Sequence, residues 1–298
     1  LIQGGGLADT TFYSSDSATA SNRPQFILTY TLPTAPLLDL DVNNSSGATG
    51  SNYANTFTEG GAAIKVADSD ASVTAGSNTI SSNLSGMTVS ISNLLDGSSE
   101  SLSAITTGTS ITASYNSGTG VLTLSGSDTA ANYQTVLRTI TYNNSSSNPT
   151  TTSRVINIIA TDPYGGNSSA VSSTITINAV NTSPSNTLPG AQSTNEDTAK
   201  VITGLSIADV DAGTGTLTVT LAVDHGTLAV SGGTATIANS GTGTVTLTGT
   251  LTQINATLSA TNGVTYTPAL NYNGADTLRM TTSDGGNSGG ATQSTAST

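Results

Sequence analysis

Residues 154–184, RVINIIATDPYGGNSSAVSSTITINAVNTSP, decide the fold of this chain. They predict a strand, a tight Pro-Tyr-Gly-Gly-Asn turn, and a second strand in which apolar residues alternate with Ser and Thr. A polar segment follows, and Pro184 ends the sheet because it has no N–H to donate to a neighbouring strand. The strand and turn recur at residues 278–290, LRMTTSDGGNSGG, with Asp284 in the place of Asp162. We interpret the stretch as a junction between repeated β domains.

A second pair of segments indicates the same repeat. Residues 122–142, LTLSGSDTAANYQTVLRTITY, correspond in order to residues 245–267, VTLTGTLTQINATLSATNGVTYT. Within each segment the spacing of apolar residues changes from the period of a strand to that of a helix. The pattern therefore predicts one short helix in each copy, and Ser127 or Asp128 can cap the first one. The predicted fold class is all-β, with two tandem, mostly antiparallel β-sandwiches.

We expect three parts along the chain. Residues 1–35 are expected to be the C-terminal strand or strands of a preceding β module, with a clear strand at residues 25–32. Residues 36–182 are the first complete repeat, and residues 183–298 are the second, with its last strand missing. The chain is expected to be an internal piece of something longer. The pattern FYSSDSATASNRPQFILTY (residues 12–30) resembles the last two strands of the jelly-roll modules called DNRLRE domains, some of which bind polysaccharide.

Composition excludes several classes of function. The 298 residues contain 6 Lys and Arg against 18 Asp and Glu, a net charge of −12, which disfavours nucleic acids and anionic membranes as partners. No long apolar run is present, so no direct membrane insertion is expected. There is no cysteine, and His225 is the one histidine, which leaves neither a disulfide framework nor the usual zinc or Ser-His chemistry. We expect the protein not to be an enzyme.

The carboxylates are grouped, not scattered. Eleven of the eighteen lie in five groups, namely Asp39 with Asp41; Glu59; Asp68 and Asp70 with Asp162; Glu196 with Asp197; and Asp209 and Asp211 with Asp284. Such groups in Gly-rich turns require a counter-charge, and Ca²⁺ takes six to eight oxygen ligands in flexible geometry. Asp-x-Asp turns, a distant Asp and linker carbonyls from residues 181–184 can supply that shell. The alternative is that each Asp starts a turn through its own side chain.

These motifs resemble those of bacterial cadherin-like repeats. ATDPYGGNSS with STITINAVNTSP is similar to that family's Asp-containing strand end and linker, ADVDAG and ADSDAS to its Asp-x-Asp turn, and NEDTA to its early Glu. The resemblance covers residues 37–298 and implies Greek-key (cadherin/Ig-like) β-sandwiches of very large secreted or surface adhesin-type proteins, stiffened by Ca²⁺ at their junctions. It carries ligand roles onto Asp209, Asp211, Asp284 and Asn181, onto Asp68, Asp70 and Asp162, and onto Glu59, Glu196 and Asp197. Thr182 stands where the family's linker has an Asp.

The expected function is a non-catalytic, calcium-stiffened spacer or adhesin stalk, secreted or on the extracellular cell surface. Its first partners are neighbouring repeats of the same chain. One alternative is a structural subunit of an extracellular filament or sheath, a homopolymer formed by strand addition at residues 25–32 and at the missing last strand. Another is a polysaccharide-binding module that contacts surface glycans through the N-terminal residues.

Overall fold

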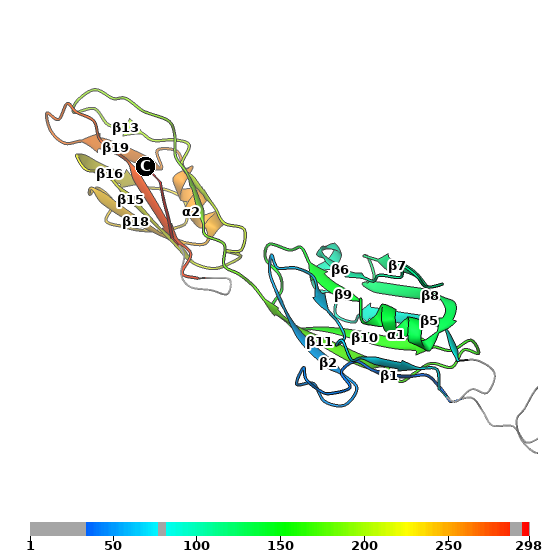
Figure 1. Cartoon of the computed structure of the whole chain (residues 1–298). Coiled ribbons are helices and arrows are strands. Elements are labelled where there is room, and N and C mark those ends of the chain that lie inside the picture. The colour runs from blue at the N-terminus through cyan, green and yellow to red at the C-terminus, as the bar shows by residue number, and fades with distance from the viewer. Residues whose placement is uncertain (1–33, 77–81, 287–293, 298) are drawn as a thin grey trace, which may run out of the picture. The chain divides into compact units, whose positions relative to one another are not determined.

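The computed structural model describes residues 34–76, 82–286 and 294–297. They divide into two compact units, the first with the described residues up to Phe57, Ala62–Asn144 and Thr152–Thr176, the second with Thr58–Gly61, Ser145–Thr151 and the residues from Ile177 onward. Figure 1 shows both units as layered strands with one α-helix each. The strand predicted at residues 25–32 and the jelly-roll resemblance lie outside the described residues.

The first unit contains a six-stranded sheet, a three-stranded sheet and a strand pair. The six-stranded sheet has the order β2 (Tyr53–Thr58), β11 (Val171–Asn178), β10 (Arg154–Thr161), β5 (Asn83–Ile91), β8 (Val121–Thr129) and β7 (Thr112–Asn116). The three-stranded sheet has the order β3 (Ile64–Lys65), β9 (Thr141–Asn144) and β6 (Glu100–Ser103), and the pair joins β1 (Leu37–Asp39) to β4 (Ser72–Thr74). A 3-10 turn at Gly97–Ser99 and helix α1 (Ala130–Leu137) complete the unit.

Alternation along the strands builds the core of this unit. In β10 every second residue is buried, including Ile156, Ile158 and Ala160, so the strand presents one continuous apolar face. From the edge strand β2, the fully buried Phe57 meets the ring of Tyr142 edge-on, with ring centroids 5.6 Å apart. This contact joins the edge of the larger sheet to the centre of the smaller one.

The second unit repeats the plan. Its five-stranded sheet has the order β17 (Thr236–Ala238), β18 (Thr244–Gly249), β15 (Leu217–Ala222), β20 (Arg279–Ser283) and β21 (Ser294–Ser297). Its three-stranded sheet has the order β13 (Lys200–Val201), β19 (Val264–Pro268) and β16 (Gly226–Val230), and β12 (Ser185–Thr187) pairs with β14 (Ser206–Ala208). The core cluster gathers aliphatic residues of these strands with Ile254 and Leu258 of helix α2 (Leu251–Leu258).

The prediction of a missing last strand is wrong. Strand β21 runs antiparallel to β20, with Ser294 opposite Ser283 and Ser297 opposite Met280. The stretch is too rich in Ser, Thr and Ala to show the apolar alternation from which strands were inferred. Backbone pairing along β20 forms the strand nonetheless.

Both helices form as expected, but the cap of the first differs from the prediction. Thr129 is the N-cap of α1, and its side chain accepts a hydrogen bond from the Asn132 N–H. The carboxylate of Asp128 accepts instead from the Ser110 N–H and from the side-chain amide of Asn132, each at 2.7 Å. Thr250 caps α2 in the same way and forms a reciprocal capping box with Gln253.

The helices also fix which strands are equivalent in the two units. The Val73 N–H in β4 donates to Gln134 Oε1 of α1 at 3.1 Å, and the Ile207 N–H in β14 donates to Asn255 Oδ1 of α2 at 2.9 Å. Gln134 and Asn255 occupy the same place in their helices. Strands β4 and β14 are therefore counterparts.

The pairing of the small sheets agrees with this equivalence. Tyr142 lies opposite Ile64 of β3, and Tyr266 lies opposite Lys200 of β13. The fold class inferred from the sequence, all-β sandwiches with a short helix in each repeat, is thus confirmed. Among the residues that the structure describes, neither α-helix has the length and apolar character needed to span a bilayer.

Candidate metal centres

In the second unit, the linker is hydrogen-bonded to two acidic turns. Asp209 and Asp211 follow β14, Asp284 follows β20, and residues 181–182 precede β12. The Thr182 N–H donates to Asp211 Oδ2, and Asn181 Nδ2 donates to Asp284 Oδ2, each at 2.7 Å. The linker is therefore fastened to the turns after two strands of the same unit.

Two of the carboxylates, those of Asp211 and Asp284, are almost completely buried. Asp284 is fully buried and Asp211 is 4% exposed. Asp209 Oδ1 accepts from the N–H groups of Asp211 and Ala212, at 3.2 Å each. Asp209 Oδ2 is buried and has no hydrogen-bond partner, although a buried carboxylate oxygen normally has one.

The charge state of Asp209 reflects this setting. Burial, reinforced by the neighbouring carboxylate of Asp211, raises the pKa of Asp209 to about 6. Two ionised carboxylates in such a site repel each other, so either a proton or a cation lowers the energy of the pair. An unpartnered buried oxygen in an all-oxygen donor set fits a hard cation such as Ca²⁺.

The first unit holds a different acidic group. Carboxylate oxygens of Asp41, Asp68 and Asp70 all lie within 4.8 Å of one another, and they are the one such group among the described residues. Asp41 is fully buried, while the other two are partly exposed. The group joins the end of β1 to the turn before β4.

The loop after β1 wraps around this group. The Ser45 N–H donates to Asp41 Oδ1 at 3.0 Å, and the Ser45 hydroxyl donates to Asp68 Oδ2 at 2.8 Å. Asp70 accepts from the N–H groups of Val42 and Asn43. Burial raises the pKa of Asp41, but hydrogen bonds from Ser46 and Ser45 outweigh it and hold that pKa below its usual value. Asp41 is consequently ionised at neutral pH.

The two Asp-x-Asp turns do not occupy equivalent places, although ADSDAS and ADVDAG resemble the same motif in sequence. Asp68 and Asp70 precede β4, whereas Asp209 and Asp211 follow its counterpart β14. The motif therefore lies on opposite sides of the same strand in the two units.

The remaining candidate residues lie apart from these groups or in their own turns. Asp162 Oδ1 accepts from the Tyr164 and Gly166 N–H groups, both at 2.8 Å, and closes its own turn. Asp39 Oδ1 accepts from the Asp41 N–H at 3.1 Å.

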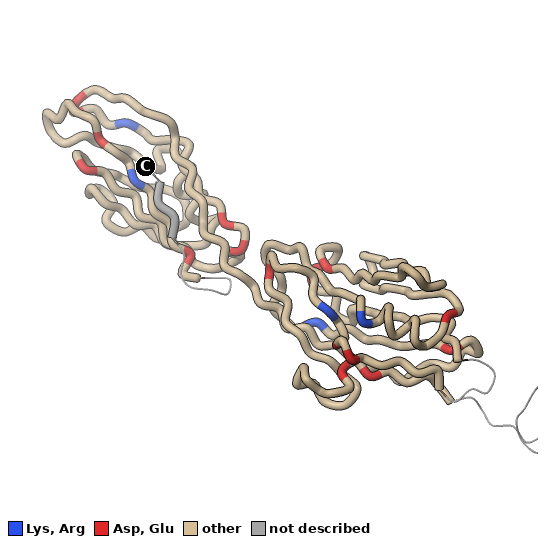
Figure 2. The backbone as a smooth tube through the Cα atoms, in the orientation of Figure 1, with Lys and Arg blue, Asp and Glu red and all other residues tan. Residues whose placement is uncertain are grey.

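The three remaining acids, Glu59, Glu196 and Asp197, accept backbone hydrogen bonds or face solvent. Glu59 Oε2 accepts from the Val180 N–H at 2.9 Å. Asp197, at a positive φ of 58°, accepts from the Asn271 N–H at 2.9 Å, and Glu196 is exposed. Figure 2 shows how far acidic positions outnumber basic ones along the chain.

Sequence reasoning missed a buried ionic network in the first unit. Arg154 and Glu100 are fully buried and form an ion pair through the Arg154 Nε. Arg154 Nη2 also contacts Asp96 Oδ2 at 2.6 Å, and the Tyr142 hydroxyl donates to Glu100 Oε1 at 2.9 Å. The alternation of β10 could have revealed it, because Arg154 occupies one of the alternate positions whose side chains are buried.

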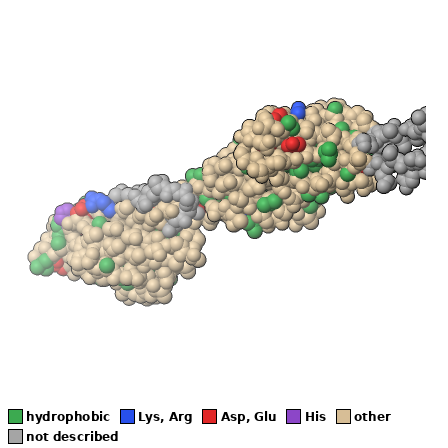
Figure 3. All heavy atoms as spheres, turned by 90° about the horizontal axis from the view of Figure 1, so that it is seen from below, with side chains coloured by type: hydrophobic (Ala, Val, Ile, Leu, Met, Phe, Trp, Pro, Cys, Tyr) green, Lys and Arg blue, Asp and Glu red, His purple; other side chains and the backbone are tan. Residues whose placement is uncertain are grey.

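The single histidine, His225, lies at the surface of the second unit. The side chain of His225 is 50% exposed and stacks on Tyr272, with ring centroids 4.4 Å apart. Its Nδ1 lies 3.8 Å from Asp276 Oδ1. Figure 3 shows it on the surface beside acidic and basic side chains. His225 is therefore a half-exposed surface residue held by stacking on Tyr272.

Comparisons with known proteins address the architecture. No family model and no curated protein matches this chain. The chain is similar to a crystal structure of Drosophila N-cadherin EC1-4 (TM-score 0.32, 16% identity, 89% of this chain and 48% of that chain). It is also similar to a crystal structure of mouse cadherin-23 EC22-24 (TM-score 0.29, 11% identity, 88% of this chain and 64% of that chain). The chain thus spans about half of the first and less than two thirds of the second.

Proposed function

We propose that this chain is a non-catalytic pair of β-sandwich repeats that binds Ca²⁺ and acts as a spacer or adhesin stalk of an extracellular protein. The observation that carries the proposal is the unpartnered, buried Oδ2 of Asp209. Its neighbour Asp211 accepts a hydrogen bond from the linker at Thr182, and Asp284 accepts one from Asn181, so the linker is tied to both acidic turns.

In the second unit, Asp209, Asp211 and Asp284 would hold the ion, with the side-chain oxygen of Asn181. The amide of Asn181 now donates its N–H to Asp284, and turning it over would present its oxygen instead. A bound Ca²⁺ supplies positive charge that offsets the repulsion between these carboxylates. The consequence for the chain is a linker that cannot swing freely at residues 181–182.

The first unit offers a second set in Asp41, Asp68 and Asp70. Here the loop N–H groups already hold the carboxylates in place, so the ligands are preorganised before an ion arrives. Their separation, within 4.8 Å, is compatible with oxygens that share one cation at 2.3–2.6 Å from each.

Composition supports the extracellular setting. A net charge of −12 favours cation binding, and extracellular calcium modules have dissociation constants of about 10⁻⁴ to 10⁻³ M, matched to the medium outside cells. Only six Lys and Arg residues leave few cleavage sites for trypsin-like proteases.

Calorimetric titration of the full chain with CaCl₂ tests the proposal. Asp209→Asn removes one charge from the second unit's set, and Asp70→Asn removes one from the first unit's set. Asp224→Asn is the matched control, because Asp224 is an exposed acid whose carboxylate pairs with Arg279. We expect each site variant to lose or weaken one binding event at least tenfold and the control to bind as the wild type does. Identical heats for all four proteins, or no heat for the wild type at millimolar Ca²⁺, would refute the proposal.

A further inference from the structure

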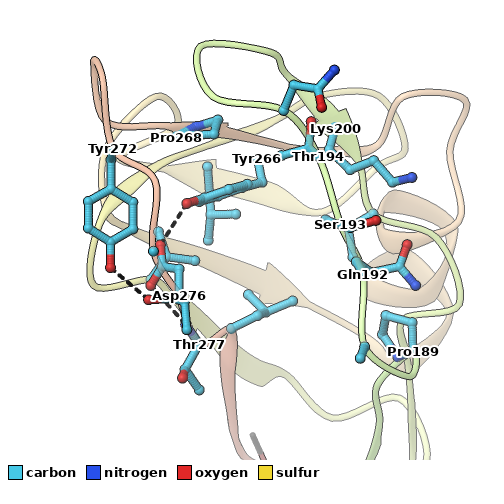
Figure 4. Close-up of a pocket in the computed structure, with 18 of the residues that line it drawn as sticks. Pro189, Gln192, Ser193, Thr194, Lys200, Tyr266, Pro268, Tyr272, Asp276 and Thr277 are labelled. Carbon is cyan, nitrogen blue, oxygen red and sulfur yellow. Dashed lines mark hydrogen bonds between the residues drawn. The ribbon is translucent and has the colours of Figure 1, made fainter.

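We draw no further inference here: the strongest candidate, the pocket of about 770 Å³ in the second unit that is lined by Tyr266, Tyr272 and residues 276–278 (Figure 4), borders the stretch just before β20, beyond the described pairing of β20 with β21, and nothing in the structure shows what covers it.

Discussion

Asn181 Nδ2 donates a hydrogen bond to Asp284 Oδ2 at 2.7 Å and thereby joins the linker at the start of the second unit to the turn after β20. The two residues are 103 positions apart. Asp284 Oδ1 accepts from the Gly286 N–H at 2.9 Å, so the carboxylate is held on both oxygens. A fully buried carboxylate held on both oxygens fixes the linker to this turn.

Replacing Asp284 by Asn should abolish most of the stabilisation that Ca²⁺ gives to the second unit, because one charged ligand is lost while the side-chain shape is kept. At ten times its dissociation constant, the ion adds roughly 1.4 kcal/mol to the free energy of unfolding. For a unit of this size, that corresponds to an increase of roughly 5 °C in melting temperature. Differential scanning calorimetry with Ca²⁺ and with EDTA measures it. An unchanged calcium shift in the variant would remove Asp284 from the ligand set.

The raised pKa of Asp209 predicts how the calcium-free protein responds to pH. Since the folded-state pKa, about 6, exceeds the ordinary value of 3.8, folding favours the protonated form. This contribution to stability is fully present below about pH 4 and is lost as pH rises through 6. In EDTA the melting temperature of the wild type, relative to that of Asp209→Asn, should therefore fall between pH 4 and pH 7. A pH-independent difference between the two proteins would contradict the prediction.

Arg154→Ala should destabilise the first unit strongly, because it leaves Glu100 and Asp96 without their buried cation. Removing one partner of a buried pair costs about 3–5 kcal/mol. Arg279→Ala is the control, since Arg279 pairs with Asp224 on the surface and such pairs contribute at most about 1 kcal/mol. Urea unfolding of both variants gives the two free energies, and similar losses would argue against the importance of the buried network.

Phe57→Ala should cost the first unit about 3–5 kcal/mol of unfolding free energy, because it removes the buried ring that packs on Tyr142. Leu37→Ala, at a position that is 67% exposed, is an apolar control and should change stability by less than about 0.5 kcal/mol. Urea unfolding followed by tyrosine fluorescence reports both. A small loss for Phe57→Ala would show that the volume beside Tyr142 need not be filled.

Strand and helix patterns were readable because they depend on local periodicity. The match of Tyr142 to Tyr266 follows from apolar spacing, and the structure pairs both residues with counterpart strands, β3 and β13. The short helices follow from the change of period at residues 127–137 and 251–258. Such features depend on residues close together in the sequence, so the local pattern is enough to predict them.

The acidic sites were harder to read, because loops set their geometry. The sequence grouped Asp41 with Asp39, yet the fold brings it to Asp68 and Asp70 through the pairing of β1 with β4. Likewise, the sequence around Asp162 resembles that around Asp284, but Asp162 Oδ1 accepts hydrogen bonds from backbone N–H groups of its own turn. Which carboxylates face one another depends on strand register, and no local pattern encodes that register.

The Asp-x-Asp motif precedes β4 in the first unit and follows β14 in the second, although each strand makes the same hydrogen bond to its helix. An alignment of the two units by their acidic motifs would therefore misplace β4 against β14. The hydrogen bond between strand and helix is the surer landmark for comparing such repeats.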